Sequence, residues 1–187
     1  MNIQSRHPTT ADEFLRWNEG REGKREFVRG RVVEMMINVT RRHWQLASRL
    51  MVQLASQLGV DQYDVGAAEF GVRTGEGVRF PDIMVEAFSK DGKALAANSP
   101  LLLAEVLSPS TMADDFGPKA RDYLALDTLQ HYLTLSQDEV RAWLWSRDDR
   151  RQWTGPEIVE GGRITLRIDG KPVFVDLDAL YRGVVGN

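Results

Sequence analysis

The chain has 187 residues, a length that fits one domain better than two, because single domains cluster at about 100–200 residues. Its 42% hydrophobic and 27% charged residues are typical of a globular protein and exclude wholesale disorder, while a net charge of −3 argues against a protein that coats nucleic acid non-specifically. The absence of cysteine excludes disulfides, thiol nucleophiles and thiolate metal sites, so any metal must bind to oxygen or imidazole.

The first third of the chain predicts a short helix, a hairpin and a long helix. Thr10 and Glu13 form a capping-box pattern, and apolar residues follow at helical spacing. Arg29-Gly30 joins two extended stretches and favours a tight hairpin, because glycine accepts positive φ. Over residues 40–58 apolar side chains recur every three to four positions, which predicts the longest helix.

The remainder predicts a sheet of short strands with one further helix. Three strand-like pieces separated by glycine-bearing turns indicate a meander, over residues 62–65, 69–73 and 78–85. The apolar run 101–107, bounded by prolines, is typical of a central strand buried on both faces. A helix with Pro118 in its first turn, a strand pair and a capped final turn follow, at residues 114–126, 130–135 with 140–145, and 176–181. We therefore expect one mixed α/β domain over residues 1–187, with a central sheet.

Glu105 stands inside the apolar run LLLAEVL, where a buried strand would carry its charge into a low-dielectric interior. Such burial costs several kcal/mol unless a cation or hydrogen-bond donors lie opposite the carboxylate. The alternatives are an edge strand whose polar residue faces water, or a neutral glutamic acid bonded to backbone.

Asp82 follows Pro81 at the entry to a second apolar strand, 23 residues before Glu105. If the two strands are neighbours, both carboxylates meet at one end of the sheet and, with a backbone carbonyl, form an oxygen site suited to Mg²⁺. Alone, Asp82 is more often a turn or capping aspartate. Lys119, on the helix after the Glu105 strand, could orient or deprotonate a water there, or offset charge on phosphorus, although most helix lysines are solvated.

The segments FPDIMVEA, LLLAEVLSPST and DDFGPKARDYLAL resemble the Uma2 family, whose members are similar to PD-(D/E)xK nucleases. The segments REFVRGRVVEM and VTRRHWQLASRL are similar to the family's hairpin and its following helix with a histidine, so the resemblance extends over residues 10–145. It implies a restriction-endonuclease-like fold, with a central mixed β-sheet flanked by helices and an N-terminal helix and β-hairpin.

Carried over position by position, the resemblance implies that Asp82 and Glu105 hold a metal ion together with the backbone carbonyl of Val106. Lys119 stands where the family places its basic catalytic residue. Glu26 matches the hairpin glutamate, a candidate catalytic group that supports the metal ligands or binds a second metal. The chain departs from the family pattern immediately before Lys119, where Pro118 replaces the usual acidic residue.

His43 matches the family's helix histidine, although its sequence position alone is equally that of a surface or capping histidine. With Arg41 and Arg42 it forms a candidate nucleic-acid contact, since neutralising phosphates supplies most non-specific affinity. Residues 1–60 carry ten Lys or Arg against six Asp or Glu, a balance of +4, which leaves 14 against 21, or −7, for the rest. A local basic surface fits this asymmetry, but solvated helix faces give the same counts.

The leading hypothesis is a metal-dependent endonuclease that uses Mg²⁺ or Mn²⁺ to hydrolyse phosphodiester bonds of nucleic acid, with DNA as the expected substrate. The main alternative is a catalytically silent dimeric module that binds nucleic acid or another partner on the same fold. For either, the apolar strands carrying Trp143, Trp145 and Trp153 offer a homodimer surface, although tryptophans are more often in the core. A third hypothesis is a metal-dependent hydrolase of a small phosphate ester.

The sequence has no apolar run near the ~20 residues of a membrane-spanning helix, and its start has no hydrophobic leader. We therefore expect a cytoplasmic protein with no membrane partner.

Overall fold

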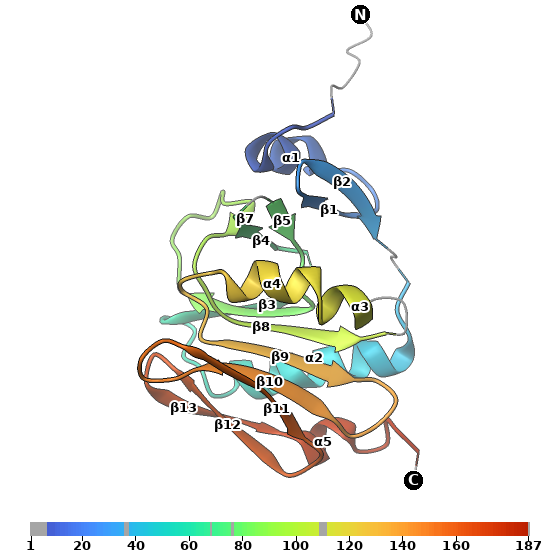
Figure 1. The fold of residues 1–187 in the computed structure, drawn as a ribbon, viewed down its shortest axis with the longest axis vertical. Coiled ribbons are helices and arrows are strands. Elements are labelled where there is room, and N and C mark those ends of the chain that lie inside the picture. The colour runs from blue at the N-terminus through green and yellow to red at the C-terminus, as the bar shows by residue number, and fades with distance from the viewer. Residues whose placement is uncertain (1–6, 36–37, 68, 76, 109–111, 187) are drawn as a thin grey trace, which may run out of the picture.

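The computed structural model describes residues 7–35, 38–67, 69–75, 77–108 and 112–186 (Figure 1). A central six-stranded sheet has the strand order β11-β10-β9-β8-β6-β3. The pair β8–β9 is parallel and the other pairs are antiparallel, so the expected mixed central sheet is confirmed. Its strands are β3 (Tyr63–Ala67), β6 (Ile83–Ala87), β8 (Pro100–Leu107), β9 (His131–Ser136), β10 (Ala142–Arg147) and β11 (Trp153–Val159).

Two smaller sheets and five helices complete the described fold. A five-stranded sheet has the order β2-β1-β5-β4-β7, with β1 (Lys24–Val28), β2 (Arg31–Met35), β4 (Gly71–Thr74), β5 (Gly77–Arg79) and β7 (Ala96–Ala97). A two-stranded sheet pairs β12 (Arg163–Ile168) with β13 (Lys171–Asp176). The helices are α1 (Ala11–Asn18), α2 (Arg41–Ala55), α3 (Met112–Asp115), α4 (Pro118–Leu124) and α5 (Leu177–Tyr181).

The N-terminal elements form as their sequence signals predict. The Thr10 side chain caps α1 by accepting from the Glu13 amide, and the Glu13 carboxylate accepts from the Thr9 amide and hydroxyl. Thr40 caps α2 in the same way. Arg29 and Gly30 have φ values of 49° and 76°, the left-handed conformations that a tight two-residue hairpin requires.

The expected meander is wrong, because residues 78–85 form two strands in different sheets. β5 belongs to the five-stranded sheet and β6 to the central sheet, and the chain crosses between them at Phe80-Pro81-Asp82. Pro81 has no amide hydrogen to donate, which favours the end of a ladder at this point. The break puts Asp82 at the start of β6, between the two sheets.

The helix expected over residues 114–126 is also divided, into α3 and α4. Pro118 is the first residue of α4, and a residue before proline is disfavoured in the helical conformation. Gly117 has φ −108° and ψ −107°, and a Cβ at this position would lie 2.6 Å from the Ala113 carbonyl oxygen. Glycine therefore permits the corner that turns α4 onto the sheet.

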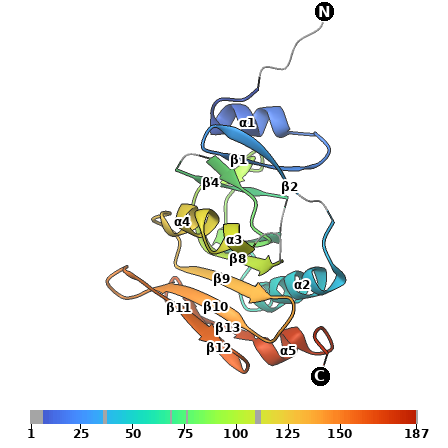
Figure 2. The same ribbon diagram turned by 45° about the vertical axis from the view of Figure 1, so that its right-hand side comes forward.

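The central sheet is covered on both faces, and β8 lies in its middle with all eight residues buried (Figure 2). On one face, Leu46, Leu50 and Leu54 of α2 repeat every four residues and pack with β12, β13 and α5. On the other face, α4 packs Ala120 and Tyr123 onto the sheet. The five-stranded sheet and α1 share a separate core. None of the described helices combines the length and apolar character needed to cross a bilayer.

Candidate active site

Asp82 and Glu105 meet at one end of the β6–β8 pair. In this antiparallel ladder Ile83 lies opposite Ala104, so the next pair outward is Asp82 and Glu105. The Val106 amide donates a hydrogen bond of 2.9 Å to Asp82 Oδ2, which fixes the aspartate against β8. Both residues are buried: Asp82 is 8% exposed and Glu105 is 3% exposed. Two acids distant in the sequence therefore share one buried site.

Lys119 supplies the cation that a buried Glu105 requires. It is the second residue of α4, and its Nζ lies 2.7 Å from Glu105 Oε1, 3.6 Å from Glu26 Oε1 and 3.7 Å from Asp115 Oδ1. Burial lowers the pKa of Lys119, but the negative charges of these three carboxylates outweigh it and raise the pKa above its ordinary value. Lys119 is therefore held as an ammonium, which favours a role in orienting water or offsetting charge rather than removing a proton.

Glu105 lies in a strongly negative environment. Burial raises its pKa well above the ordinary value, and the charges of Asp82 and Asp115 add to this, while Lys119 acts in the opposite direction. The Tyr123 hydroxyl donates a 3.1 Å hydrogen bond to Glu105 Oε1, the oxygen that also contacts Lys119. A bound cation would lower the cost of ionising this carboxyl, because the positive charge of a metal reverses the local electrostatic balance.

Glu26 is fixed by the elements around it. Its Oε1 accepts a 3.1 Å hydrogen bond from the Phe80 amide, and its Oε2 lies 2.8 Å from Arg79 Nη1. The buried Arg79 also contacts Asp122 at 2.7 Å and Asp114 at 3.2 Å. Glu26 therefore connects the N-terminal hairpin to Lys119, while Arg79 neutralises acids that would otherwise add to the negative charge.

Sequence reasoning did not identify Arg79, Asp114, Asp115 or Asp122 as part of this cluster. The paired acids Asp114 and Asp115 were the available signal, because Asp115 stands four residues before Lys119. Their contacts with Arg79 depend on how the five-stranded sheet sits against α3 and α4, which sequence periodicity does not reveal.

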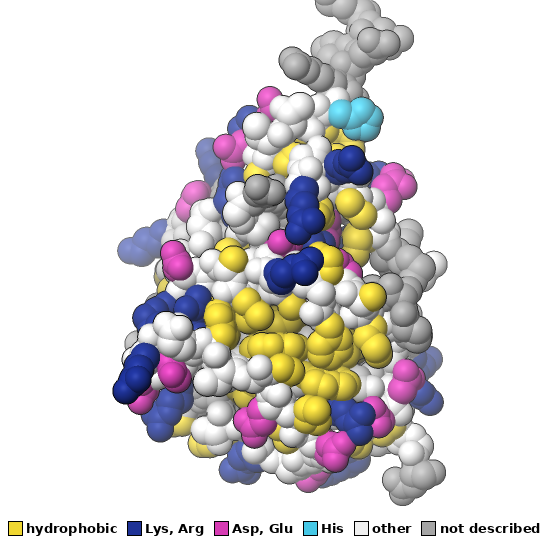
Figure 3. Space-filling view, in the orientation of Figure 1, with side chains coloured by type: hydrophobic (Ala, Val, Ile, Leu, Met, Phe, Trp, Pro, Cys, Tyr) yellow, Lys and Arg dark blue, Asp and Glu magenta, His cyan; other side chains and the backbone are white. Residues whose placement is uncertain are grey.

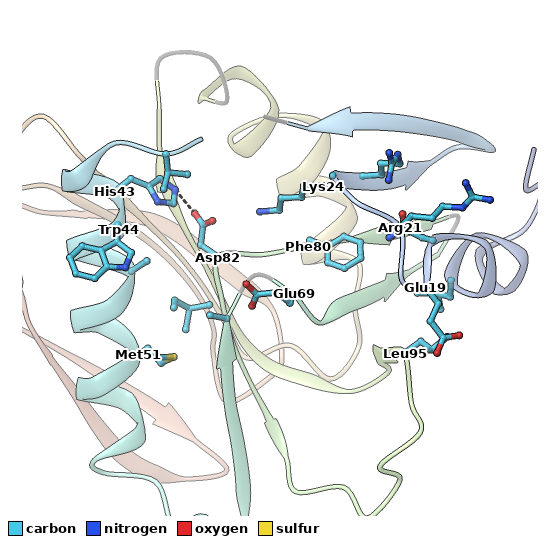
Figure 4. Close-up of a pocket in the computed structure, with 18 of the residues that line it drawn as sticks. Glu19, Arg21, Lys24, His43, Trp44, Met51, Glu69, Phe80, Asp82 and Leu95 are labelled. Atoms are coloured by element: carbon cyan, nitrogen blue, oxygen red, sulfur yellow. Dashed lines mark ion pairs between the residues drawn. The ribbon is translucent and has the colours of Figure 1, made fainter. Parts of the chain in front are cut away.

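His43 contacts Asp82 rather than lying free on the surface. Its Nε2 is 3.0 Å from Asp82 Oδ2, and its side chain is only 13% exposed (Figure 4). Burial raises the pKa of Asp82, but the hydrogen bond and charge of His43, the Val106 amide and the charge of Lys24 together lower it below the ordinary value. Asp82 is thus stabilised as a carboxylate.

Arg41 and Arg42 do not join this group. Both are exposed at the start of α2, and Arg42 Nη1 lies 3.3 Å from Asp138 Oδ1. The structure therefore brings His43 to the acidic pair and leaves the two arginines at the surface.

A cavity of about 670 Å³ opens beside Asp82 (Figure 4). One wall is α2 with Trp44, and the opposite wall is the segment from α1 to β1 with Lys24 and Arg25. Glu69 and Asp82 lie between these walls. A molecule in this cavity would reach the acidic pair from the side of Asp82.

The donor atoms of the acidic pair fit a hard divalent cation. Within the described residues, Asp82 Oδ1 and Glu105 Oε2 accept no hydrogen bond, and no group of three or more His, Asp and Glu side chains is placed to hold a metal alone. Mg²⁺ is commonly bound by one or two carboxylates and retains several waters, so a two-carboxylate site supplemented by the Val106 carbonyl suits it. Such a site needs no third acidic ligand.

Comparisons with known proteins agree with this architecture. A family model described as "Uma2: Putative restriction endonuclease" matches residues 11–172. The chain is 28% identical to the uncharacterized protein slr1290 of Synechocystis, in a match that covers 92% of this chain and 91% of that protein. It is 29% identical to the uncharacterized protein sll1609 of the same organism, in a match that covers 80% of this chain and 87% of that protein.

A solved structure has the same fold. The crystal structure of a "putative nuclease belonging to DUF820" from Anabaena variabilis aligns with a TM-score of 0.71 and 17% identity, covering 93% of this chain and 98% of that one. The restriction-endonuclease-like α/β fold expected from the sequence is therefore confirmed.

Proposed function

The chain belongs to the Uma2 family, and on this premise we propose that it is a metal-dependent endonuclease that hydrolyses phosphodiester bonds of nucleic acid, with DNA as the expected substrate. The observation that carries the proposal is the convergence of Asp82 and Glu105 on one buried site with Lys119 at 2.7 Å from Glu105. Oxygen ligands beside an ammonium are the groups that phosphodiester hydrolysis with a divalent cation requires.

Asp82 Oδ1, Glu105 Oε2 and the Val106 carbonyl would hold Mg²⁺ or Mn²⁺. Once bound, the ion would polarise the phosphate and lower the pKa of a water molecule. The residues of the chain itself prepare this site: Val106 and His43 hold Asp82 in place, and Tyr123 holds Glu105.

Lys119 would orient the attacking water or stabilise the negative charge that develops on the phosphate oxygens. Glu26 and Asp115 hold its ammonium, and Arg79 holds Glu26, so we assign Glu26 a positioning role. Arg41 and Arg42 remain candidates for phosphate contacts outside the cavity, while His43 faces Asp82 and is better placed to orient that ligand.

The protein would act as a homodimer. Hydrophobic side chains gather on the face of the molecule that carries α4 and the late strands of the central sheet (Figure 3). Trp143 of β10 pairs in register with Ile158 of β11, which is 58% exposed, and packs edge-on against Phe116. Contiguous exposed apolar surface of this kind favours association.

The test is cleavage of plasmid and of single-stranded nucleic acid with Mg²⁺ or Mn²⁺ by the wild type and by Asp82→Asn and Glu105→Gln. We expect each substitution to reduce the cleavage rate at least about 100-fold, the scale of losing one preorganised catalytic group. Both should also weaken Mn²⁺ binding measured by calorimetry, which reports on the site without turnover.

Glu86→Gln is the matched control, because Glu86 is a buried carboxylate on the same strand β6 but at its other end. Cleavage at the wild-type rate by both site variants would refute the metal site. Nucleic-acid binding without any cleavage by the wild type would instead favour the silent binding module.

A further inference from the structure

The cavity beside Asp82 has two chemically different walls. Along α2, Trp44, Ala47 and Met51 line one side at helical spacing and give it an apolar, aromatic character. Across the cavity, Arg21, Lys24 and Arg25 of the α1–β1 segment line the other side (Figure 4). One wall can therefore contact an aromatic ring while the other contacts an anion.

Trp44 is unusually open for a tryptophan, with 59% of its surface exposed although it lines the cavity. It follows His43, whose ring contacts Asp82, so both residues stand in the first turn of α2 and line the same cavity (Figure 4). Large exposed aromatic side chains beside a cavity are typical of binding surfaces, and base stacking on tryptophan tolerates any base.

The cationic wall has donor groups of Lys24 and Arg25 that are available to bind an anion. Arg25 Nη1 is buried and has no hydrogen-bond partner among the described residues, and its Nε is 3.7 Å from Glu34. Lys24 forms no ion pair with any described residue and points toward Asp82 (Figure 4). Unpaired donors of this kind match the oxygens of a phosphate.

The acids of the cavity limit where a phosphate can lie. Glu19, Glu69 and Asp82 also line it, and Glu69 and Asp82 lie toward its centre (Figure 4). A phosphate is therefore favoured against Lys24 and Arg25, or at the acidic pair only when a divalent cation neutralises Asp82.

We propose that this cavity binds an unpaired nucleotide of a single-stranded nucleic acid, with its base stacked on Trp44 and its phosphate held by Lys24 and Arg25. In a duplex both faces of each base are covered by neighbouring bases, so only an unpaired or extruded base presents a face to Trp44. A cavity of about 670 Å³ lies within the usual range of ligand pockets, about 300–1,000 Å³. The inference rests on the proposed nuclease function and specifies its substrate as a single strand.

The test measures binding without turnover, in EDTA, by the fluorescence anisotropy of a labelled 12-nucleotide DNA strand and of the same strand annealed to its complement. The wild type should bind the single strand at least about tenfold more tightly than the duplex. Trp44→Ala should weaken single-strand binding about tenfold, the low end of what stacking one base contributes. Trp44→Phe should stay within about twofold, since phenylalanine keeps an aromatic face.

Phe174→Ala is the matched control, because Phe174 is an exposed aromatic residue on β13 that does not line the cavity. Lys24→Gln should make the slope of log affinity against log salt concentration less steep by about one, because one phosphate contact fewer releases one counterion fewer. An RNA strand of the same sequence shows which sugar is preferred, and the loss caused by Trp44→Ala should be the same for both. Equal affinity for single strand and duplex, or a Trp44→Ala variant indistinguishable from Phe174→Ala, would overturn the inference.

The two proposals fail separately in these experiments. Single-strand binding that depends on Trp44 supports the inference even if no nucleic acid is cleaved. Cleavage that depends on Asp82 together with binding that ignores Trp44 overturns the inference alone.

Discussion

The ammonium of Lys119 is surrounded by more negative charge than it can balance. Glu105, Glu26 and Asp115 all lie within 3.7 Å of its Nζ, and Asp82 lies beside Glu105. Arg79 offsets part of this excess through Glu26, but its other contacts are with Asp114 and Asp122. The raised pKa of Glu105 follows first from burial and then from this remaining negative charge. The site is thus arranged to gain from one more cation.

Replacing Lys119 by methionine tests this balance through stability. The substitution keeps the length of the side chain but leaves buried carboxylates without their ammonium, a change that costs roughly 3–5 kcal/mol when one partner of a buried pair is removed. Without Lys119 the folded-state pKa of Glu105 rises further above its unfolded value, and a raised carboxyl pKa means that stability is lost as the pH rises. Urea unfolding should therefore show a larger loss at pH 8 than at pH 5.

Lys119→Arg keeps the positive charge and should show the pH dependence of the wild type. Lys90→Met controls for loss of an exposed lysine and should change the free energy of unfolding by less than about 0.5 kcal/mol. A loss for Lys119→Met that is equal at both pH values would contradict the charge balance described above.

At the scale of the elements, His131 joins the central sheet to the two-stranded sheet. Its Nε2 lies 2.9 Å from the Arg167 carbonyl oxygen and 3.0 Å from the Arg167 amide nitrogen on β12, and its Nδ1 lies 2.9 Å from the Ser146 hydroxyl on β10. Burial lowers the pKa of His131 below 6.5, and the Arg167 backbone only partly opposes this. The folded protein therefore holds this imidazole in its neutral form.

A lowered histidine pKa predicts acid sensitivity at this junction. At pH values between the folded-state pKa of His131 and its unfolded value of 6.5, the unfolded chain binds more protons than the folded protein does. The stability that His131 contributes is therefore present above pH 6.5 and is lost as the pH falls toward the folded-state pKa. His131→Gln removes the titrating group, so in urea unfolding the variant should lose less stability than the wild type between pH 7.5 and 5.5. Parallel pH profiles for the two proteins would refute this role.

Local signals predicted most of the elements, and tertiary contacts account for the differences. The caps at Thr10 and Thr40 and the buried strand around Glu105 follow from interactions within a few residues, and they form as expected. The division of residues 78–85 into two strands could have been anticipated, because Pro81 has no amide hydrogen. The sequence did not indicate to which sheet each of the two strands belongs.

In the candidate site, too, local sequence patterns predicted part of the arrangement and tertiary packing determined the rest. Periodicity places Leu103 and Glu105 on one face of β8, and that is the face covered by α4. The meeting of Asp82 with Glu105 required the strand order, which the family resemblance supplied. The contact between His43 and Asp82 and the contacts of Arg79 depend on how separate layers pack, and single-sequence patterns do not contain that information.

At the scale of the whole molecule, the hydrophobic face in Figure 3 lies away from the α2 side of the central sheet. Phe116, Trp143 and Trp153 are only partly buried there, and Ile158 adds an exposed apolar side chain beside Trp143. A stable dimer needs a well-packed interface of about 1,200–2,000 Å² in total, with an apolar centre. An aromatic cluster of this kind provides such a centre.

Ile158→Glu tests the dimer with little risk to folding, because the side chain is already exposed. The wild type should have about twice the chain mass of 21.2 kDa in light scattering, and the charged variant should shift toward the monomer because its carboxylate would be buried unpaired. Val52→Glu, at an exposed apolar position on α2 on the other side of the sheet, should leave the mass unchanged. A monomeric wild type, or equal effects of both substitutions, would show that this face does not join two copies of the chain.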